Sequence, residues 1–533
     1  MHIANSGASN SPHFRLGRSK ESFAKKRSST TKRSATVQSV ASLAQSTSQS
    51  RWLALVVLCA GMLMIILDQT VVNVALPSIQ RDLGFSQSSL AWVVNAYLIP
   101  FGGLLLLAGR LGDLVGRKRI VLAGLLVFTA GSALCGLSQS QLMLVVARFV
   151  QGIGGAMASA LILGMIVALF PEPREQARAI GVFSFVAAAG GAIGLLAGGV
   201  LTQAINWHWI FFVNLPIGLA AVVLAMRLLQ SAPGLGLAAG ADVPGAVLIT
   251  SSLMLGVYTI VGEAADNGWS SVRTLVFGVA SLLLFVAFIA RQATQARPLL
   301  PLGIFKSRNL SGANLVQMLM VAAMFGMFFL GSLYLQRVLL YDALQIGLAF
   351  LPVAIVIGAF SIEIAARLAG RFGARNVLLC GLTFILGGLA VFAVAPVDAQ
   401  YVPQILPAMA LLGLGGGLSF PSLMTLAMSG ATADDAGLTS GLVNTTAQVG
   451  GSLGLAVLAT LSTARTQNLL ADGASLNVAL TGGFHLAFGV GAGLIVLAMA
   501  LAATLLNRAQ ASQSLVEADA GPSADGVLED CAA

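Results

Sequence analysis

The chain has 533 residues, of which 57% are hydrophobic and only 9% are charged. Because an ordinary globular domain carries about 25% charged residues, this composition excludes a soluble enzyme and indicates a polytopic α-helical membrane protein. The formal net charge of +9 would suggest nucleic-acid binding only if the basic residues lined one folded face, but they are concentrated in an N-terminal tail and in short loops.

The first 51 residues are rich in Ser and Thr, and they hold nine of the 29 Lys and Arg residues beside a single acid, Glu21. A segment with so few apolar residues has no core to bury, so residues 1–51 are predicted to be a disordered basic tail, either solvated or touching anionic lipid head groups. The tail also lacks the short apolar core of a cleavable signal peptide, and the first hydrophobic span is therefore expected to be retained.

Fourteen apolar segments follow, each close to the length of about 20 residues that crosses a bilayer core. They are predicted at residues 52–76, 90–109, 120–138, 141–165, 179–202, 209–229, 243–262, 274–291, 310–336, 344–366, 376–396, 403–426, 440–463 and 482–506. With the tail left aside, 15 basic residues fall in the loops on one side and four in the loops on the other. The positive-inside rule then places both termini in the cytoplasm.

A short stretch after the second span recurs 257 residues later in the chain. Residues 109–118 read GRLGDLVGRK and residues 366–375 read ARLAGRFGAR, although two short basic loops can also be alike by chance. Both copies follow an even-numbered span, as duplicated halves related by an axis along the membrane normal would require. The predicted fold is therefore an all-α polytopic membrane protein with 14 transmembrane helices arranged 6+2+6.

This arrangement divides the chain into five predicted parts. They are the basic cytoplasmic tail 1–51, an N-terminal six-helix bundle 52–230, a linker with the seventh and eighth helices 231–308, a C-terminal six-helix bundle 309–506 and a cytoplasmic C-terminal tail 507–533.

The loop after the second span carries Gly109, Asp113, Gly116 and Arg117. The glycines permit a tight turn, and Asp113 can accept from helix N-terminal amides or pair with an arginine, which would latch two helices in one conformation. The alternative is a basic loop that only sets the topology.

Two charged residues lie inside predicted spans. Asp68 belongs to the stretch LDQTVVNVALP of the first span, and Arg148 opens the stretch RFVQGIGGA of the fourth. A charge inside a span is costly and marks a functional site by default. At about 1.5 Å per residue both lie at comparable depth in the outer half, so protonation of Asp68 is expected to be coupled to its interaction with Arg148. A purely structural ion pair, or a carboxylate satisfied by polar neighbours, is the alternative.

The fifth span is rich in glycine. Three glycines recur at every fourth residue and create a flat face on which another helix can pack closely, with or without any meaning for transport. The series consists of Gly181, Gly190, Gly194, Gly198 and Gly199.

Together these four stretches resemble the major facilitator superfamily, specifically its fourteen-helix drug:proton antiporter branch, the EmrB/QacA type. The stretches WHWIFFVNLPIG at 207–218 and GLAFLP at 347–352 are similar to the same branch. The chain departs from the pattern at Leu195, where the branch has proline, and at His208, where it usually has arginine.

The resemblance implies proton-coupled secondary active efflux of hydrophobic small molecules by a multidrug or antibiotic exporter in the cell membrane. Two six-helix bundles would rock around a central site, with Asp68 exchanging proton for substrate and Arg148 modulating it. The glycine face of the fifth helix would serve the interface between the bundles, and Gln151 is a possible substrate or proton site. The expected partners are small hydrophobic substrates, protons and membrane lipid.

Glu363 lies near the cytoplasmic end of the tenth span, four residues before Arg367. This spacing favours a helical ion pair, and a substrate or proton site is the alternative. Because Asp68 and Glu363 are essentially the only acids identified inside the spans, lipophilic monocations or neutral compounds are expected as substrates in preference to highly charged ones.

No stretch resembles a phosphate loop, a metal site or a hydrolytic triad, so no enzyme activity, cofactor, metal or nucleic acid is expected. Two other functions stay open: a dedicated exporter or importer of one metabolite, and a transporter-derived membrane sensor. The sequence predicts no long outer domain that would indicate whether an adaptor protein docks on the chain.

Overall fold

The computed structural model describes residues 48–506, apart from residues 87, 171, 231–233, 235, 237–239, 296–297 and 430–435. Most of the predicted basic tail, up to residue 47, and the predicted C-terminal tail lie outside the described residues. Met1–Leu53 and Ala54–Ala533 form two separate units, and the fold described below is that of the second.

The described residues form helices and loops, with no β-strand among them. Short turns of π-helix occur at η3 (Thr259–Glu263), η5 (Phe360–Ile364) and η6 (Tyr401–Ile405), and 3₁₀ turns at η1 (Ser89–Ala91) and η4 (Leu302–Lys306). The α-helices are α2 (Ser48–Leu83), α3 (Trp92–Val115), α4 (Arg117–Gly136), α5 (Gln141–Leu169), α6 (Pro173–Ala204), α7 (Trp209–Phe212), α8 (Asn214–Leu228), α9 (Val243–Tyr258), α10 (Ala264–Asn267), α11 (Val272–Thr294), α12 (Arg308–Arg337), α13 (Ala343–Ala359), α14 (Ala365–Phe372), α15 (Ala374–Ala393), α16 (Leu406–Met428), α17 (Ala436–Ala471) and α18 (Leu476–Leu505).

Twelve helical stretches among the described residues are long and apolar enough to cross a membrane, so the chain is a multi-pass membrane protein. These twelve stretches coincide with twelve of the fourteen predicted spans. The predicted spans at 179–202 and 344–366 fall on α6 and on α13 to α14, where the described apolar helices Ile193–Ala204 and Ala343–Ala359 are shorter.

The two copies of the repeated loop have a similar backbone. Gly116, with a φ of 112°, separates α3 from α4, and Gly373, with a φ of 82°, separates α14 from α15. A Cβ atom strains a backbone with positive φ, which accounts for glycine at both positions. Because these two glycines are separated by the offset of the sequence repeat, the local structure supports a duplication.

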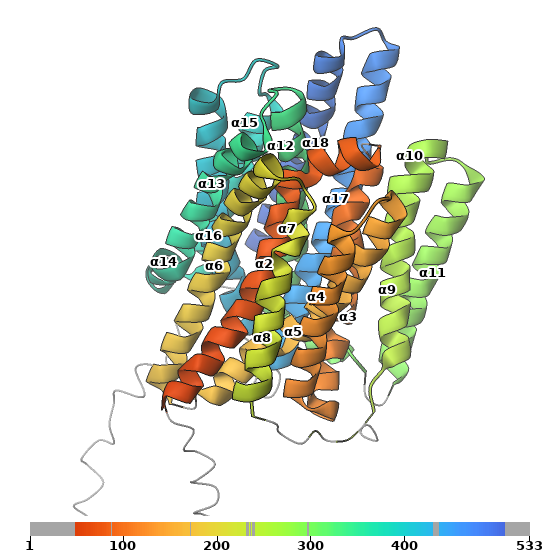
Figure 1. Ribbon diagram of the computed structural model, residues 1–533. Helices are drawn as coiled ribbons and strands as arrows, with labels where there is room; N and C mark the ends of the chain where they lie inside the picture. The colour runs from red at the N-terminus through yellow and green to blue at the C-terminus, as the bar shows by residue number, and fades with distance from the viewer. Residues whose placement is uncertain are drawn as a thin grey trace, which may run out of the picture. The chain divides into compact units, whose positions relative to one another are not determined.

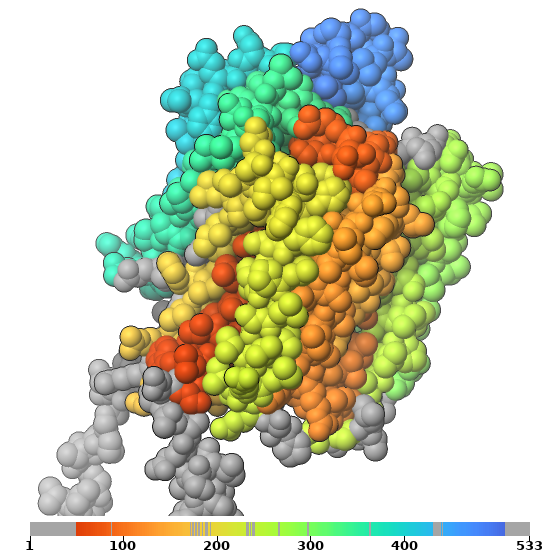
Figure 2. Space-filling model, viewed as in Figure 1, coloured from red at the N-terminus to blue at the C-terminus, as the bar shows by residue number. Residues whose placement is uncertain are grey.

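The helices pack in two groups with a hairpin beside them (Figure 1). Helices α3, α4, α5 and α8 pack on one another, and α12, α15, α16, α17 and α18 do the same. Two of the joins between the groups are α3 on α17 and α6 on α13, since α6 also packs on α5 and α13 also packs on α16. The hairpin of α9 and α11 packs through α9 on α3, and Figure 2 shows it in light green along the flank of the orange helices.

Small residues allow the two joins to be close. A Cβ atom added to Gly102 of α3 would lie 2.8 Å from the Cβ of Gln448 on α17, and one added to Gly347 of α13 would lie 2.6 Å from the carbonyl oxygen of Leu195 on α6. Within a membrane, apolar burial gives little driving force for helix association, so close backbone packing contributes much of the stability.

A buried carboxylate fastens one end of the α9–α11 hairpin. Asp242 caps α9 by accepting from the Gly245 N–H at 3.0 Å, and it also accepts from Arg291 Nε at 2.6 Å and Gln292 Nε2 at 2.8 Å on α11. Burial raises the pKa of the Asp242 carboxyl, but the hydrogen bonds from Arg291, Gln292 and Gly245 outweigh burial and hold the pKa below its ordinary value. Asp242 is therefore charged at neutral pH.

We expect Asp242→Asn to destabilise the protein by about 1–3 kcal/mol at pH 7, because charge-assisted hydrogen bonds are lost. A depressed pKa contributes stability above the unfolded pKa of about 3.9, and this contribution disappears as the pH falls through the lower folded value. The difference in thermal unfolding temperature between wild type and variant should thus be constant near neutral pH and shrink below about pH 4. A difference that stays the same down to that pH would contradict this account.

Candidate functional site

The candidate site is built on a buried ion pair between helices that are distant in sequence. Arg148 Nη1 on α5 donates to Asp68 Oδ2 on α2 at 2.5 Å. The side chain of Asp68 is 0% exposed and that of Arg148 is 1% exposed. Removing two charges from water costs several kcal/mol per ion, so such a pair persists only with good geometry and additional hydrogen bonds.

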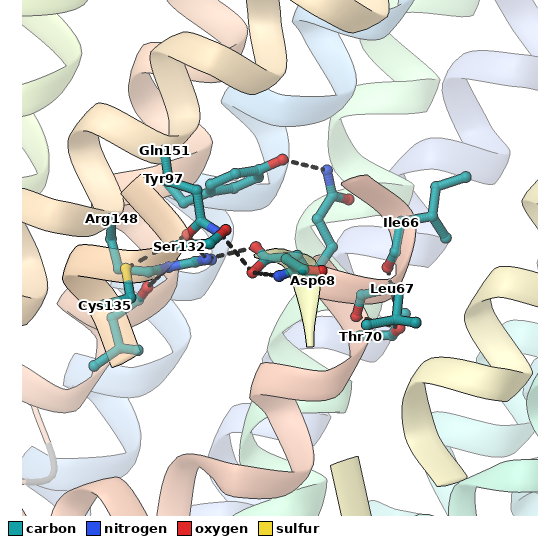
Figure 3. A network of polar contacts seen from close by, with 12 residues as sticks. Ile66, Leu67, Asp68, Thr70, Tyr97, Ser132, Cys135, Arg148 and Gln151 are labelled. Carbon is teal, nitrogen blue, oxygen red and sulfur yellow. Dashed lines mark hydrogen bonds and ion pairs between the residues drawn. The ribbon is translucent and has the colours of Figure 1, made fainter. Parts of the chain in front are cut away.

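Neutral side chains supply those hydrogen bonds to Asp68 (Figure 3). Gln151 Nε2, one turn after Arg148 on α5, donates to Asp68 Oδ1 at 2.7 Å and to Ser132 Oγ on α4 at 2.7 Å. Asn214 Nδ2 on α8 donates to Asp68 Oδ1 at 3.3 Å. Both carboxylate oxygens therefore accept hydrogen bonds, and the network joins α2, α4, α5 and α8.

The guanidinium of Arg148 is equally well held. Its Nε donates to the Val93 carbonyl oxygen on α3 at 2.9 Å, and its Nη1 also donates to Gln151 Oε1 at 2.6 Å. The Arg148 Cζ atom lies 4.4 Å from the centroid of the Tyr97 ring, within the range of a cation–π interaction. The arginine is thus fixed by α3 and α5 and presents the Nη1 edge of its guanidinium to Asp68.

The structure brings three predicted site residues, Asp68, Arg148 and Gln151, into direct contact. Ser132 and Asn214 are not predicted from the sequence, and their only signal is that each is a polar residue in an apolar helix. Tyr97 has no sequence signal, because an aromatic residue in a membrane helix is ordinary packing material.

The predicted latch forms a local ion pair. Asp113 near the end of α3 accepts from Arg117 at the start of α4 at 3.2 Å, and the two side chains are 42% and 47% exposed. An exposed pair of this kind contributes about 0–1 kcal/mol. Gly116 forms the turn between the two helices, whereas no atom lies within 4 Å of a Cβ added to Gly109. The pair thus joins two consecutive helices across their turn.

Other basic residues of the same loop hold the chain that leaves α8. Lys118 Nζ donates to the carbonyl oxygens of Met226 at 2.7 Å and Leu229 at 2.5 Å, at the C-terminal end of α8. Arg110 Nε donates to the Gly240 carbonyl oxygen at 3.3 Å, just before α9. A cation at a helix C-terminus is favourable, so this loop ties α3 and α4 to α8 and to the start of the hairpin.

The glycine face of α6 packs on α2, which differs from the expected place between the bundles. Cβ atoms added to Gly190 and Gly198 would lie 3.0 Å from Leu63 Cδ1 and 2.8 Å from the Val71 carbonyl oxygen, and one added to Gly194 would overlap Thr70 Oγ1.

Gly199 does lie at a join between the helix groups, with 2.9 Å between its added Cβ and the Ala343 carbonyl oxygen at the start of α13. Gly181 belongs to a part of α6 whose surroundings are outside the described residues. The every-fourth spacing puts Gly190, Gly194 and Gly198 on one face of α6, while the helix that this face contacts depends on the packing.

Glu363 lies on the π-helical turn η5. Its side chain is outside the described residues, so its predicted ion pair with Arg367 remains a prediction. Among the described residues, no group of three or more His, Cys, Asp or Glu side chains could hold a metal ion.

Comparisons with known proteins agree on one family and one fold. The family model of the Major Facilitator Superfamily matches residues 58–455. The puromycin resistance protein pur8 of Streptomyces alboniger is 39% identical over 89% of this chain and 95% of its own length. The cephamycin export protein CmcT of Amycolatopsis lactamdurans is 37% identical over 79% of this chain and 87% of its own length.

The solved structures that resemble the chain include that of an auto-inhibited POT family peptide transporter. Its TM-score is 0.61 at 16% identity, and the match covers 85% of this chain and 97% of that one. At this level of identity the likeness concerns the fold alone.

Proposed function

The chain belongs to the Major Facilitator Superfamily, and from this premise we propose that it is a proton-coupled exporter of hydrophobic small molecules of the fourteen-helix antiporter branch. The observation that carries the proposal is the fully buried pair of Asp68 and Arg148 with Gln151 bonded to both. Ionisable residues that face the interior of a membrane helix bundle mark substrate pathways and proton relays in transporters.

Relatives that are named for antibiotic resistance and export support the direction of transport. Two of them are named for puromycin resistance and cephamycin export, and another for resistance to and export of tetracenomycin C. Since each of these names refers to one antibiotic, a dedicated exporter of a single compound is the second candidate. A transport screen over cationic and neutral antibiotics separates it from a multidrug exporter.

The network gives a physical reason for coupling protons to substrate. With Asp68 charged, its oxygens accept from Arg148, Gln151 and Asn214. Adding a proton removes the charge that Arg148 faces and puts an O–H group where donors already converge, so the network must rearrange. In the proposed cycle the rearranged state releases substrate outside, and proton release to the cytoplasm restores the pair and the state that loads substrate.

The fourteen-helix, 6+2+6 arrangement belongs to this proposal. It is supported by the helices that cover all fourteen predicted ranges and by the paired turns at Gly116 and Gly373. The excess of basic residues in alternate loops supports cytoplasmic termini and a cell-membrane location. Within this arrangement, the loop with Asp113 and Arg117 is proposed to act as the conformational latch on the cytoplasmic side.

The opposite end of the bundle carries contacts that alternating access would have to break. Ser332 Oγ on α12 donates to the Asn73 carbonyl oxygen on α2 at 2.7 Å, and Arg337 donates to Gln80 near the ends of the same two helices. Gln80 and Arg337 are 257 residues apart, the same separation as the two copies of the repeated loop, so they occupy equivalent positions of the two halves. We therefore assign the outer gate to the meeting of α2 and α12.

Everted membrane vesicles test the proposal. A fluorescent lipophilic cation should accumulate when an inward-acid gradient is imposed, and the accumulation should collapse on adding an uncoupler. Vesicles without the protein are the control. Uptake that persists after the gradient has collapsed would contradict proton coupling, and if no cationic or neutral compound is taken up, the non-transport alternative of a membrane sensor is favoured.

A further inference from the structure

Glu263 is a second buried acid inside a candidate membrane span. It is 7% exposed and is the last residue of the span Val243–Glu263. Tyr258 Oη donates to Glu263 Oε1 at 3.0 Å, and Asn267 Nδ2 donates to Oε2 at 3.0 Å. The ion pairs of the described residues do not include it. A buried acid that is held only by neutral donors within a membrane-spanning segment is costly and marks a functional site by default.

The backbone around Glu263 is unusual. Glu263 closes the π-helical turn η3, and such turns are rare and are frequently found at functional sites. In this turn the Ile260 carbonyl oxygen accepts from Thr460 Oγ1 on α17 at 3.1 Å, and the turn also packs on η1 at the start of α3. The carboxylate therefore lies where the hairpin meets helices of both groups.

The hydrogen-bond partners of Glu263 suit both of its protonation states. A tyrosine hydroxyl donates to a carboxylate and, after rotating its hydrogen, accepts from a carboxylic acid, while the Asn267 amide can donate to the other oxygen in either case. Asp68 differs, because it faces the permanent charge of Arg148. Glu263 can thus gain or lose a proton while both hydrogen bonds are kept, with a rotation of the Tyr258 hydroxyl hydrogen.

The ionisable groups on the elements that pack around η3 form no ion pair with Glu263 among the described residues. Arg273 on α11 and Arg465 on α17 are exposed, and neither forms an ion pair with Glu263. On the carboxylate's own segment, Tyr258 is a titratable partner, and the side chain of Asp266 is outside the described residues.

We propose that Glu263 is a second proton-binding site, which lies in the hairpin of α9 and α11 and functions in addition to Asp68. This inference deepens the proposed function and rests on proton-driven export. The hairpin is then part of the transport machinery. A change in the charge of Glu263 acts on η3, the turn through which the hairpin accepts a hydrogen bond from Thr460 of α17.

Infrared difference spectroscopy of the full-length protein in nanodiscs, recorded between neutral and acidic pH, tests the proposal without any transport substrate. A carboxylic C=O band at the high frequency typical of apolar surroundings is expected on acidification. It should be absent in Glu263→Gln and shifted in Tyr258→Phe, where one hydrogen bond is lost. Asp472→Asn is the matched control, because it removes an exposed carboxylate from the loop between α17 and α18 and should leave the band in place.

A transport experiment adds a second readout. In everted vesicles, the kinetic order of the uptake rate with respect to proton concentration should be lower by one in Glu263→Gln than in wild type. Thermal unfolding close to that of wild type would show that the variant is folded, as expected for a glutamine that still accepts from Asn267. Proton-driven uptake together with an unchanged infrared band in Glu263→Gln would overturn the second site and leave the proposed function standing. Loss of the band in a protein that transports no probe would support proton binding by Glu263 while contradicting the proposed export.

Discussion

Asp68→Asn is expected to lower gradient-driven uptake in everted vesicles by at least about tenfold, which corresponds to about 1.4 kcal/mol in the barrier. Asparagine keeps the size of the side chain and one accepting oxygen, but it cannot exchange a proton. The residual uptake should no longer respond to an uncoupler. The measurement is the initial rate at equal amounts of protein in the membrane.

The variant needs a control for folding, because it leaves Arg148 buried without its counter-ion. Removing one partner of a buried pair typically costs about 3–5 kcal/mol. The double variant Asp68→Asn with Arg148→Gln removes both charges and should recover much of the lost thermal stability, yet it should remain uncoupled. Full proton-driven uptake by this double variant would move the proton site away from Asp68.

Asp82→Asn provides the matched control on the same helix. Asp82 is an exposed carboxylate on α2 that accepts from Trp207 Nε1 at 2.8 Å, and it lies outside the network around Asp68. We expect its replacement to leave the dependence of uptake on the proton gradient unchanged. Equal losses in both variants would indicate that any neutralised acid on α2 disturbs the helix.

Much of the helical architecture is predictable from the sequence for a simple physical reason. A chain in a bilayer must satisfy its backbone hydrogen bonds internally, so an apolar run of about 20 residues forms a helix. The same cost of burial singles out Asp68 and Arg148 in the sequence as candidate site residues, because a charge inside an apolar span is expensive. Their direct contact agrees with the comparable depths estimated from the sequence.

The remaining members of the network depend on how helices rotate and pack. Ser132 and Asn214 become significant only because α4 and α8 turn these residues toward Asp68, and a single sequence carries little information on such rotations. Glu263 is missed for a different reason. Glu263 lies one residue beyond the predicted span 243–262, where an acid is ordinarily interpreted as the end of the span. Only its burial and the π-helical turn distinguish it from an exposed acid at a helix end.

The glycine series shows the same division between what spacing determines and what packing determines. Residues at every fourth position must share a helix face, whatever that face contacts. The structure adds that the contacted helix is α2 and that Gly194 lies directly beside the turn that carries Asp68. The glycine face therefore supports the segment of α2 that carries the proposed proton site.

Gly194→Ala is accordingly expected to disturb both stability and coupling. The added Cβ would overlap Thr70 Oγ1 and would lie 3.0 Å from the carbonyl oxygen of Leu67, so α2 must move away from α6 on both sides of Asp68. Overpacking of this kind costs about 1–3 kcal/mol. Thermal unfolding in detergent should show the loss, and proton-driven uptake should fall with it because Asp68 shifts relative to Arg148.

Two further variants make the Gly194 prediction specific to the contact with α2. Gly191→Ala introduces the same methyl group on the same helix where no atom lies within 4 Å, and it should behave like wild type. Adding Thr70→Ala to Gly194→Ala removes the hydroxyl that the methyl group meets and should restore part of the stability and of the uptake. If Gly191→Ala is as damaging as Gly194→Ala, the effect comes from the glycine content of α6 and the close contact with α2 is not its cause.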